Sequence, residues 1–167
     1  MSLELINTLA QTIAAVGVIA SLVFVGVQIR RNTVAIRAQT FHAVTDSFNT
    51  VNLTLGATPQ TARVARLGFA GLANLNEDER AQFAFGATAV MRVFETIYYQ
   101  SKVGVVEKKL WETEQKTMAS LLSLPGMREW WATNVLENYT IEFRALVDRT
   151  IAALPPATRG NMEARHD

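Results

Sequence analysis

The chain of 167 residues contains no cysteine, which excludes disulfides, thiolate nucleophiles and cysteine-ligated metals. The sequence patterns GxSxG, GxxxxGK and GxGxxG, which are typical of acyl transfer, phosphate binding and dinucleotide binding, are also missing. No lysine or arginine precedes residue 30, and residues 5–29 carry no charge of either sign. The sequence therefore indicates no particular reaction, and the uncharged run is its most informative feature.

The 25 uncharged residues from Leu5 to Ile29 predict a transmembrane helix. At about 1.5 Å of rise per residue such a helix is roughly 37 Å long, which exceeds the ~30 Å hydrocarbon core of a bilayer. A cleaved signal peptide is one alternative, but the only charge before the run is Glu4 and no small-residue cleavage site follows it. A buried core helix is the other alternative, although core helices rarely continue so far without a charge. We expect residues 1–29 to form a single membrane anchor.

The orientation of this anchor follows from the charges that flank it. Arg30, Arg31 and Arg37 come after the run, and the first acidic residue beyond Glu4 is Asp46. Because positively charged flanks stay in the cytoplasm, we expect a cytoplasmic C-terminal part, with the short N-terminus outside. The three arginines are then placed to contact lipid headgroups.

Residues 30–154 predict one all-α cytoplasmic domain, followed by a disordered tail at 155–167. All 16 basic residues and 14 of the 15 acidic residues follow the anchor, and this near balance argues against a nucleic-acid partner. The membrane helix is expected to continue as a long cytoplasmic helix to about Leu55, which packs with four to five further helices. Its apolar positions repeat at heptad-like spacing, at Val34, Phe41, Val44, Phe48, Val51 and Leu55.

Capping patterns and breakers predict the remaining helices. Thr58-Pro59 begins a short helix to about Phe69, and Asn76 begins another to about Lys102. The latter should bury Phe83, Ala87, Val90, Phe94 and Ile97. Further helices are expected from about Glu107 to Leu124, around Trp130 and Trp131 after a break at Pro125-Gly126, and from Thr140 to about Leu154.

One face of the predicted membrane helix combines small and polar residues. This face lies within about 60° on a helical wheel, and such faces allow close contact with another helix. It is rotated by about 100° from the cytoplasmic apolar positions, so the two stretches should face different neighbours. We expect the cytoplasmic positions to pack under the chain's own helices, and the membrane face to meet a second copy or another membrane protein. The membrane face comprises Ala10, Ala14, Gly17, Ser21 and Gln28.

Candidate catalytic side chains are few. His42 and Asp46 are four residues apart, a spacing at which a carboxylate can orient an imidazole, but a solvated surface pair is the simpler interpretation. Glu95 lies beside Tyr98 and Tyr99, where it could act in catalysis or form a structural ion pair with an arginine. Trp130 and Trp131 could both pack in the core, or one could contact headgroups or a partner. No cofactor or metal site is predicted.

A resemblance accompanies these patterns. The stretch from Ser21 to Thr33, SLVFVGVQIRRNT, and the residues Ala35, Arg37, Ala38 and Thr40 after it, resemble an uncharacterised family of small bacterial membrane proteins with one N-terminal transmembrane helix and a cytoplasmic helical domain. The resemblance implies a bacterial inner-membrane setting and transfers no activity or site residue. It extends to Phe94-Glu95, Tyr98-Tyr99-Gln100, Gly104, Trp111, Pro125-Gly126 and Trp130-Trp131.

Three functions remain open at this point. The missing catalytic motifs and the small-polar face favour a membrane-anchored interaction protein that self-associates or serves as an accessory subunit. An enzyme or ligand-binding domain with its cleft between the cytoplasmic helices is an alternative, with His42, Glu95, Tyr98 and Tyr99 as candidates. An oligomeric pore lined by Asn7, Gln11 and Gln28 is the third.

Overall fold

The computed structural model of the chain describes residues 3–134 and 138–156, apart from the side chain of Asn134. This described part contains six α-helices, one short 3-10 helix and no strand, which confirms the predicted all-α fold with a long apolar N-terminal helix. Most of the predicted tail, from residue 157 on, lies outside the described residues. The chain divides into two compact units, residues 1–39 and 40–167. Helix α1 (Leu3–Gly56) contributes to both units.

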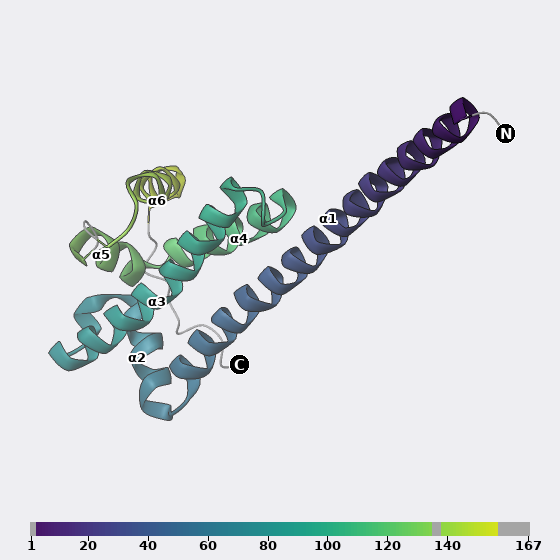
Figure 1. Ribbon diagram of the computed structural model, residues 1–167. Coiled ribbons are helices and arrows are strands. Elements are labelled where there is room, and N and C mark those ends of the chain that lie inside the picture. Colours follow the sequence, from purple (N-terminus) through teal and green to yellow (C-terminus); the bar gives the residue numbers. More distant parts are fainter. Residues whose placement is uncertain (1–2, 135–137, 157–167) are drawn as a thin grey trace, which may run out of the picture. The chain divides into compact units, whose positions relative to one another are not determined.

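The second unit contains the last part of α1 and all later helices (Figure 1). Helix α3 packs against α2, α4 and α5, while α6 packs against α4. The bounds are α2 (Pro59–Ala70), η1 (Leu72–Asn74), α3 (Glu77–Lys102), α4 (Lys108–Leu122), α5 (Pro125–Asn134) and α6 (Ile141–Ala153).

The predicted caps of α2 and α3 are present. The side chain of Thr58 accepts from the N–H of Thr61, and the side chain of Asn76 accepts from the N–H of Glu79. In both cases the later side chain accepts in return from the backbone N–H of the cap residue, so each pair forms a capping box. The N–H of Asn76 and the guanidinium of Arg63 lower the pKa of Glu79. The Arg63–Glu79 ion pair also links α2 to the start of α3.

The starts of α5 and α6 differ in detail from the predicted boundaries. Pro125 does not merely interrupt the chain, because α5 begins with it, in the first helical turn where proline loses no hydrogen bond. Thr140 occupies the N-cap position of α6, as predicted, but its side chain makes no capping bond. Gly126 allows α5 to pack closely on α2, because a Cβ at this position would lie 1.6 Å from the carbonyl oxygen of Gly68.

The core of the second unit is built from apolar side chains of all six helices that the structure describes. The predicted buried face of α3 is confirmed at Phe83, Ala87, Phe94 and Ile97, while Val90 is partly buried. Each fully buried large side chain contributes about 1.5–3 kcal/mol relative to exposure. The side chains exposed by less than 2 % include Phe94, Phe143, Met91, Ile97, Met118, Leu122 and Met127.

The heptad-like row on α1 packs over a shorter length than the sequence predicts. Val44 is buried against Ile97 and Val106, and Phe48 packs against the same cluster. Phe41, in contrast, is 51 % exposed, and Val34, in the first unit, is 62 % exposed. The prediction that the row packs under later helices was therefore wrong for Phe41, which lies in the second unit but stays half exposed.

Candidate functional site

Helix α1 is the one described helix that is long and apolar enough to cross a membrane. Its thirteen large apolar side chains between Leu5 and Ile29 are all between 46 % and 71 % exposed. Water is a poor solvent for such a surface, because each exposed side chain forgoes about 1.5–3 kcal/mol of burial. A contiguous apolar surface of this size is typical of segments that contact a membrane or another protein.

The hydroxyl groups of this segment are satisfied within the helix. Thr12 donates to the carbonyl oxygen of Thr8 at 2.9 Å, and Ser21 donates to that of Gly17 at 2.8 Å. Thr8 makes the same type of bond to Glu4. A helix with these bonds brings no unsatisfied hydroxyl donor into a hydrocarbon environment.

The side-chain amides of this segment differ from its hydroxyls. The side chains of Asn7, Gln11 and Gln28 make no hydrogen bond to any residue that the structure describes. In hydrocarbon, an amide of this kind gains from a hydrogen bond to another helix. Gln28 belongs to the predicted contact face with Ala10, Ala14, Gly17 and Ser21, and a Cβ at Gly17 would meet nothing within 4 Å. That face is uncovered, and its role as a contact face remains a prediction.

Arg30, Arg31 and Arg37 are exposed and follow the apolar stretch on the same helix. This spacing is compatible with the predicted headgroup contacts, which the structure of the chain by itself does not test.

The four predicted cleft residues do not come together. His42 is exposed and makes an edge contact with the ring of Phe41, with centroids 6.2 Å apart. Tyr99 is exposed, whereas Tyr98 packs against Trp111 and Phe143 at centroid distances of 5.5 Å and 6.0 Å. Only Glu95 among the four is buried.

Glu95 has a structural role. One carboxylate oxygen accepts from the guanidinium of Arg92 at 2.8 Å, and the other accepts from the backbone N–H of Thr140 at 2.7 Å. The second bond satisfies the backbone N–H of the N-cap residue of α6 and ties that helix to α3. The structural ion pair predicted as the simpler interpretation is therefore the arrangement observed.

Tyr139 completes this cluster, and sequence reasoning missed it. The Arg92 guanidinium lies 4.9 Å from the centre of the Tyr139 ring, and the Tyr139 hydroxyl donates to the carbonyl oxygen of Thr88 at 3.2 Å. Burial raises the pKa of Tyr139 to about 12, and the nearby Glu95 charge acts in the same direction, while Arg92 opposes it. The spacing of Arg92 and Glu95 on one helix was the only sequence signal for the cluster.

Both tryptophans of α5 are buried, Trp130 to 2 % and Trp131 to 7 % exposure. The Trp131 indole N–H donates to a carboxylate oxygen of Asp148 on α6 at 2.9 Å. Core packing of both residues, the simpler of the two interpretations, is therefore correct, and neither ring faces a membrane.

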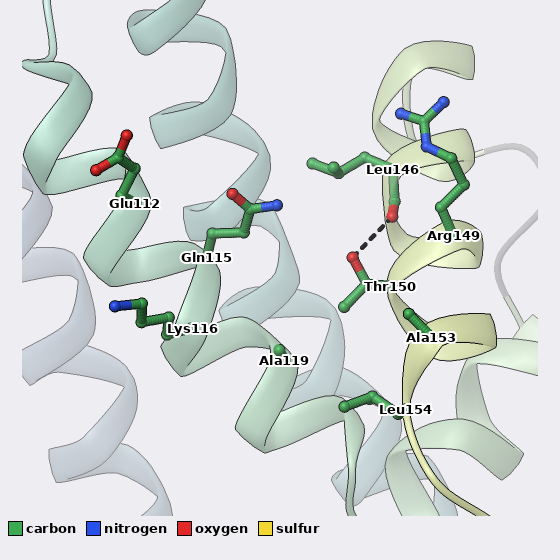
Figure 2. A pocket seen from close by; sticks show the side chains of 9 residues that line it. All are labelled: Glu112, Gln115, Lys116, Ala119, Leu146, Arg149, Thr150, Ala153 and Leu154. Carbon is green, nitrogen blue, oxygen red and sulfur yellow. Dashed lines mark hydrogen bonds between the residues drawn. The ribbon is translucent and has the colours of Figure 1, made fainter.

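A shallow groove of about 570 Å³ lies between α4 and α6 (Figure 2). Leu146, Leu154 and Gln115 point into it, while Lys116 points away from it. The hydroxyl of Thr150 donates to the carbonyl oxygen of Leu146 at 2.9 Å and so is already occupied. Because the charged groups do not converge on the groove, it is poorly suited to an anionic ligand. Among the described residues no group of three or more His, Asp or Glu side chains could hold a metal ion.

No protein family matches this chain, and no curated protein or solved structure shows significant similarity to it.

Proposed function

We propose that this protein is anchored in the bacterial inner membrane by residues 5–29 and acts through contacts with other proteins, either by self-association or as an accessory subunit of a membrane complex. The observation that carries the proposal is the run of thirteen exposed large apolar side chains from Leu5 to Ile29, for which the described chain provides no cover. The proposed orientation, with the helical domain in the cytoplasm, is supported by the arginines that follow this run.

The interaction role is supported by the polar groups of the same helix. Gly17 and Ser21 have small side chains, so the helix backbone is accessible there, and the amide of Gln28 lies on the same face. Small residues allow two helix backbones to approach closely, and an amide then gains a partner across the contact. The enzyme alternative has less support, because Glu95 is engaged by Arg92 and Thr140 while His42 and Tyr99 lie on the surface.

The test is the mass of the purified particle in mild detergent, measured by light scattering with detergent correction. We expect a defined assembly for the unmodified chain, and a smaller particle for the double variant Gly17→Leu, Ser21→Leu. The matched control is Ala15→Leu with Gly26→Leu, which adds similar bulk to the opposite side of the helix. Equal masses for all three proteins would contradict the contact face. A ring-like homo-oligomer that conducts ions would instead favour the pore.

A further inference from the structure

A cavity of about 350 Å³ lies in the second unit where α1, α2 and α3 meet. Val64 and Phe83, both nearly fully buried, belong to its wall. Its lining includes the small residues Ala65 on α2 and Ala89 on α3, and Leu55 of α1 packs close to Gly86, where a Cβ would lie 2.9 Å from Leu55 Cδ2. The other lining residues are Thr50, Val51, Thr54, Thr61, Gln82 and Phe85.

The threonines of this lining present few free donors to the cavity. Thr50 donates to the carbonyl oxygen of Asp46 and Thr54 to that of Thr50, both at 2.8 Å. Thr61 is engaged in the capping box with Thr58. Because these hydroxyl hydrogens are used inside the helices, the threonines offer no donors for a sugar or a nucleotide.

Charge is also missing from the lining: none of its twelve residues, all of them described, is ionisable near neutral pH. A buried charge on a ligand would therefore have no counter-ion, which makes its transfer from water costly. Gln82 alone contributes an amide, and it is exposed, so it can pair with a neutral polar group at the edge of the cavity.

Phe85 adds apolar surface beside the opening. Its ring is 78 % exposed although it belongs to the cavity lining. An apolar ligand chain could cover part of this ring and remove it from water, which is favourable by about 25 cal/mol per Å².

We propose that this cavity binds a single medium-length alkyl chain that carries a neutral amide, ester or hydroxyl group, with the chain among Val51, Val64 and Phe83 and the polar group toward Gln82. At about 30 Å³ for a water-sized group, the cavity holds roughly a dozen such groups, which matches a chain of about ten carbons. Either a free small molecule or an acyl chain of a membrane lipid has this chemistry.

The test is photo-crosslinking of the full-length protein in lipid nanodiscs, with adducts located by mass spectrometry. One arm uses a free decyl amide with a diazirine on its chain, and the other uses nanodiscs made with a diazirine-labelled phospholipid. We expect adducts within residues 50–89 in at least one arm, and the arm that gives them identifies the source. Adducts restricted to residues 5–29 in both arms would overturn the proposal.

Two variants make this test specific to the cavity. Ala89→Trp and Thr54→Trp each place a large ring in the lining, and we expect about tenfold less labelling of residues 50–89. The control is Ala81→Trp, an exposed position on the same helix that does not line the cavity. Thermal unfolding shows which variants remain folded. One folded cavity variant is enough for the test. Equal labelling in a folded cavity variant and in the control would contradict the proposal.

Discussion

The two units of the chain differ in how their large apolar side chains are covered. In the second unit, the large side chains of α3 and α5 are buried by the chain's own helices, as at Phe94 and Trp130. In the first unit, the apolar side chains of α1 have no such cover, and a residue such as Val16 remains 60 % exposed. Both units are helical, so helix formation does not distinguish them. What distinguishes them is the exposure of their apolar side chains, which are buried in the second unit and exposed along the apolar run of α1.

Glycine shows the same contrast. Gly126 lies where α5 and α2 touch, and a Cβ there would collide with the backbone of Gly68, whereas Gly17 has open space around it. The glycine of the core is a packing requirement of the chain itself. The glycine of the apolar helix is free of any intramolecular requirement, which leaves its surface available to another helix.

The largest effect is expected on membrane insertion, when arginine is placed in the apolar run of the first unit. Ile19→Arg with Val23→Arg should cost about 5–7 kcal/mol of membrane insertion, at about 2.5–3.5 kcal/mol per residue near the centre of a span. We expect this variant to leave the membrane fraction, as measured by alkaline extraction and centrifugation. Leu53→Arg is the control, because Leu53 is 73 % exposed on the same helix but lies in the second unit. Retention of the double variant in the membrane would contradict a bilayer location for this part of α1.

Gly126→Ala should destabilise the second unit by about 3 kcal/mol or more, since neither backbone at the contact with α2 can yield cheaply. Thermal unfolding followed by the tryptophan signal measures this loss. Gly17→Ala should leave the same transition unchanged, because a Cβ there meets nothing in the chain. Similar unfolding temperatures for the two variants would mean that α5 does not pack on α2 in this way.

A smaller effect is expected for Glu95→Gln. The amide can still accept from the Thr140 N–H, but it loses the charge that pairs with Arg92. We expect a loss of about 1–3 kcal/mol in unfolding free energy, measured by urea denaturation in detergent. Asp46→Asn, a change at an exposed carboxylate elsewhere in the unit, provides the comparison for charge removal alone. A stability equal to that of the parent chain would remove the structural role of Glu95.

The smallest effect is a dependence on alkaline pH. Because the pKa of Tyr139 is raised to about 12 in the fold, from a usual value of 10, the folded state holds this proton more tightly. The resulting stabilisation is complete below pH 10 and is lost as the pH rises through 12, with an upper limit of about 2.7 kcal/mol at 1.36 kcal/mol per pKa unit. Tyr139→Phe should flatten stability over this range, as followed by thermal unfolding at several pH values. A parent chain whose stability is level from pH 9 to 12 would contradict this.

Local sequence signals predicted the helices well. Thr58-Pro59 and Asn76 mark the starts of α2 and α3 because capping depends on residues within one turn. The buried face of α3 was equally accessible from its periodicity.

Interactions between distant parts of the chain were not predictable. The bond between Glu95 and Thr140 joins residues 45 positions apart, and nothing local at Thr140 indicates which carboxylate it meets. The exposure of Phe41 has the same origin, since an apolar pattern shows that a residue could pack but not whether a partner is present. The cavity beside Phe85 likewise depends on how three helices meet, which no single pattern encodes.

The proposed bilayer location of the apolar half of α1 can be tested by measuring how accessible positions along this helix are to water. Because the chain contains no cysteine, a single introduced thiol reports one position. Val16→Cys and Leu53→Cys would place thiols at positions 60 % and 73 % exposed in the structure, and maleimide reacts only with the thiolate that forms in water. In permeabilised native membranes, we expect rapid labelling at residue 53 and almost none at residue 16. Equal labelling at the two positions would show that the apolar half of α1 does not lie in a bilayer.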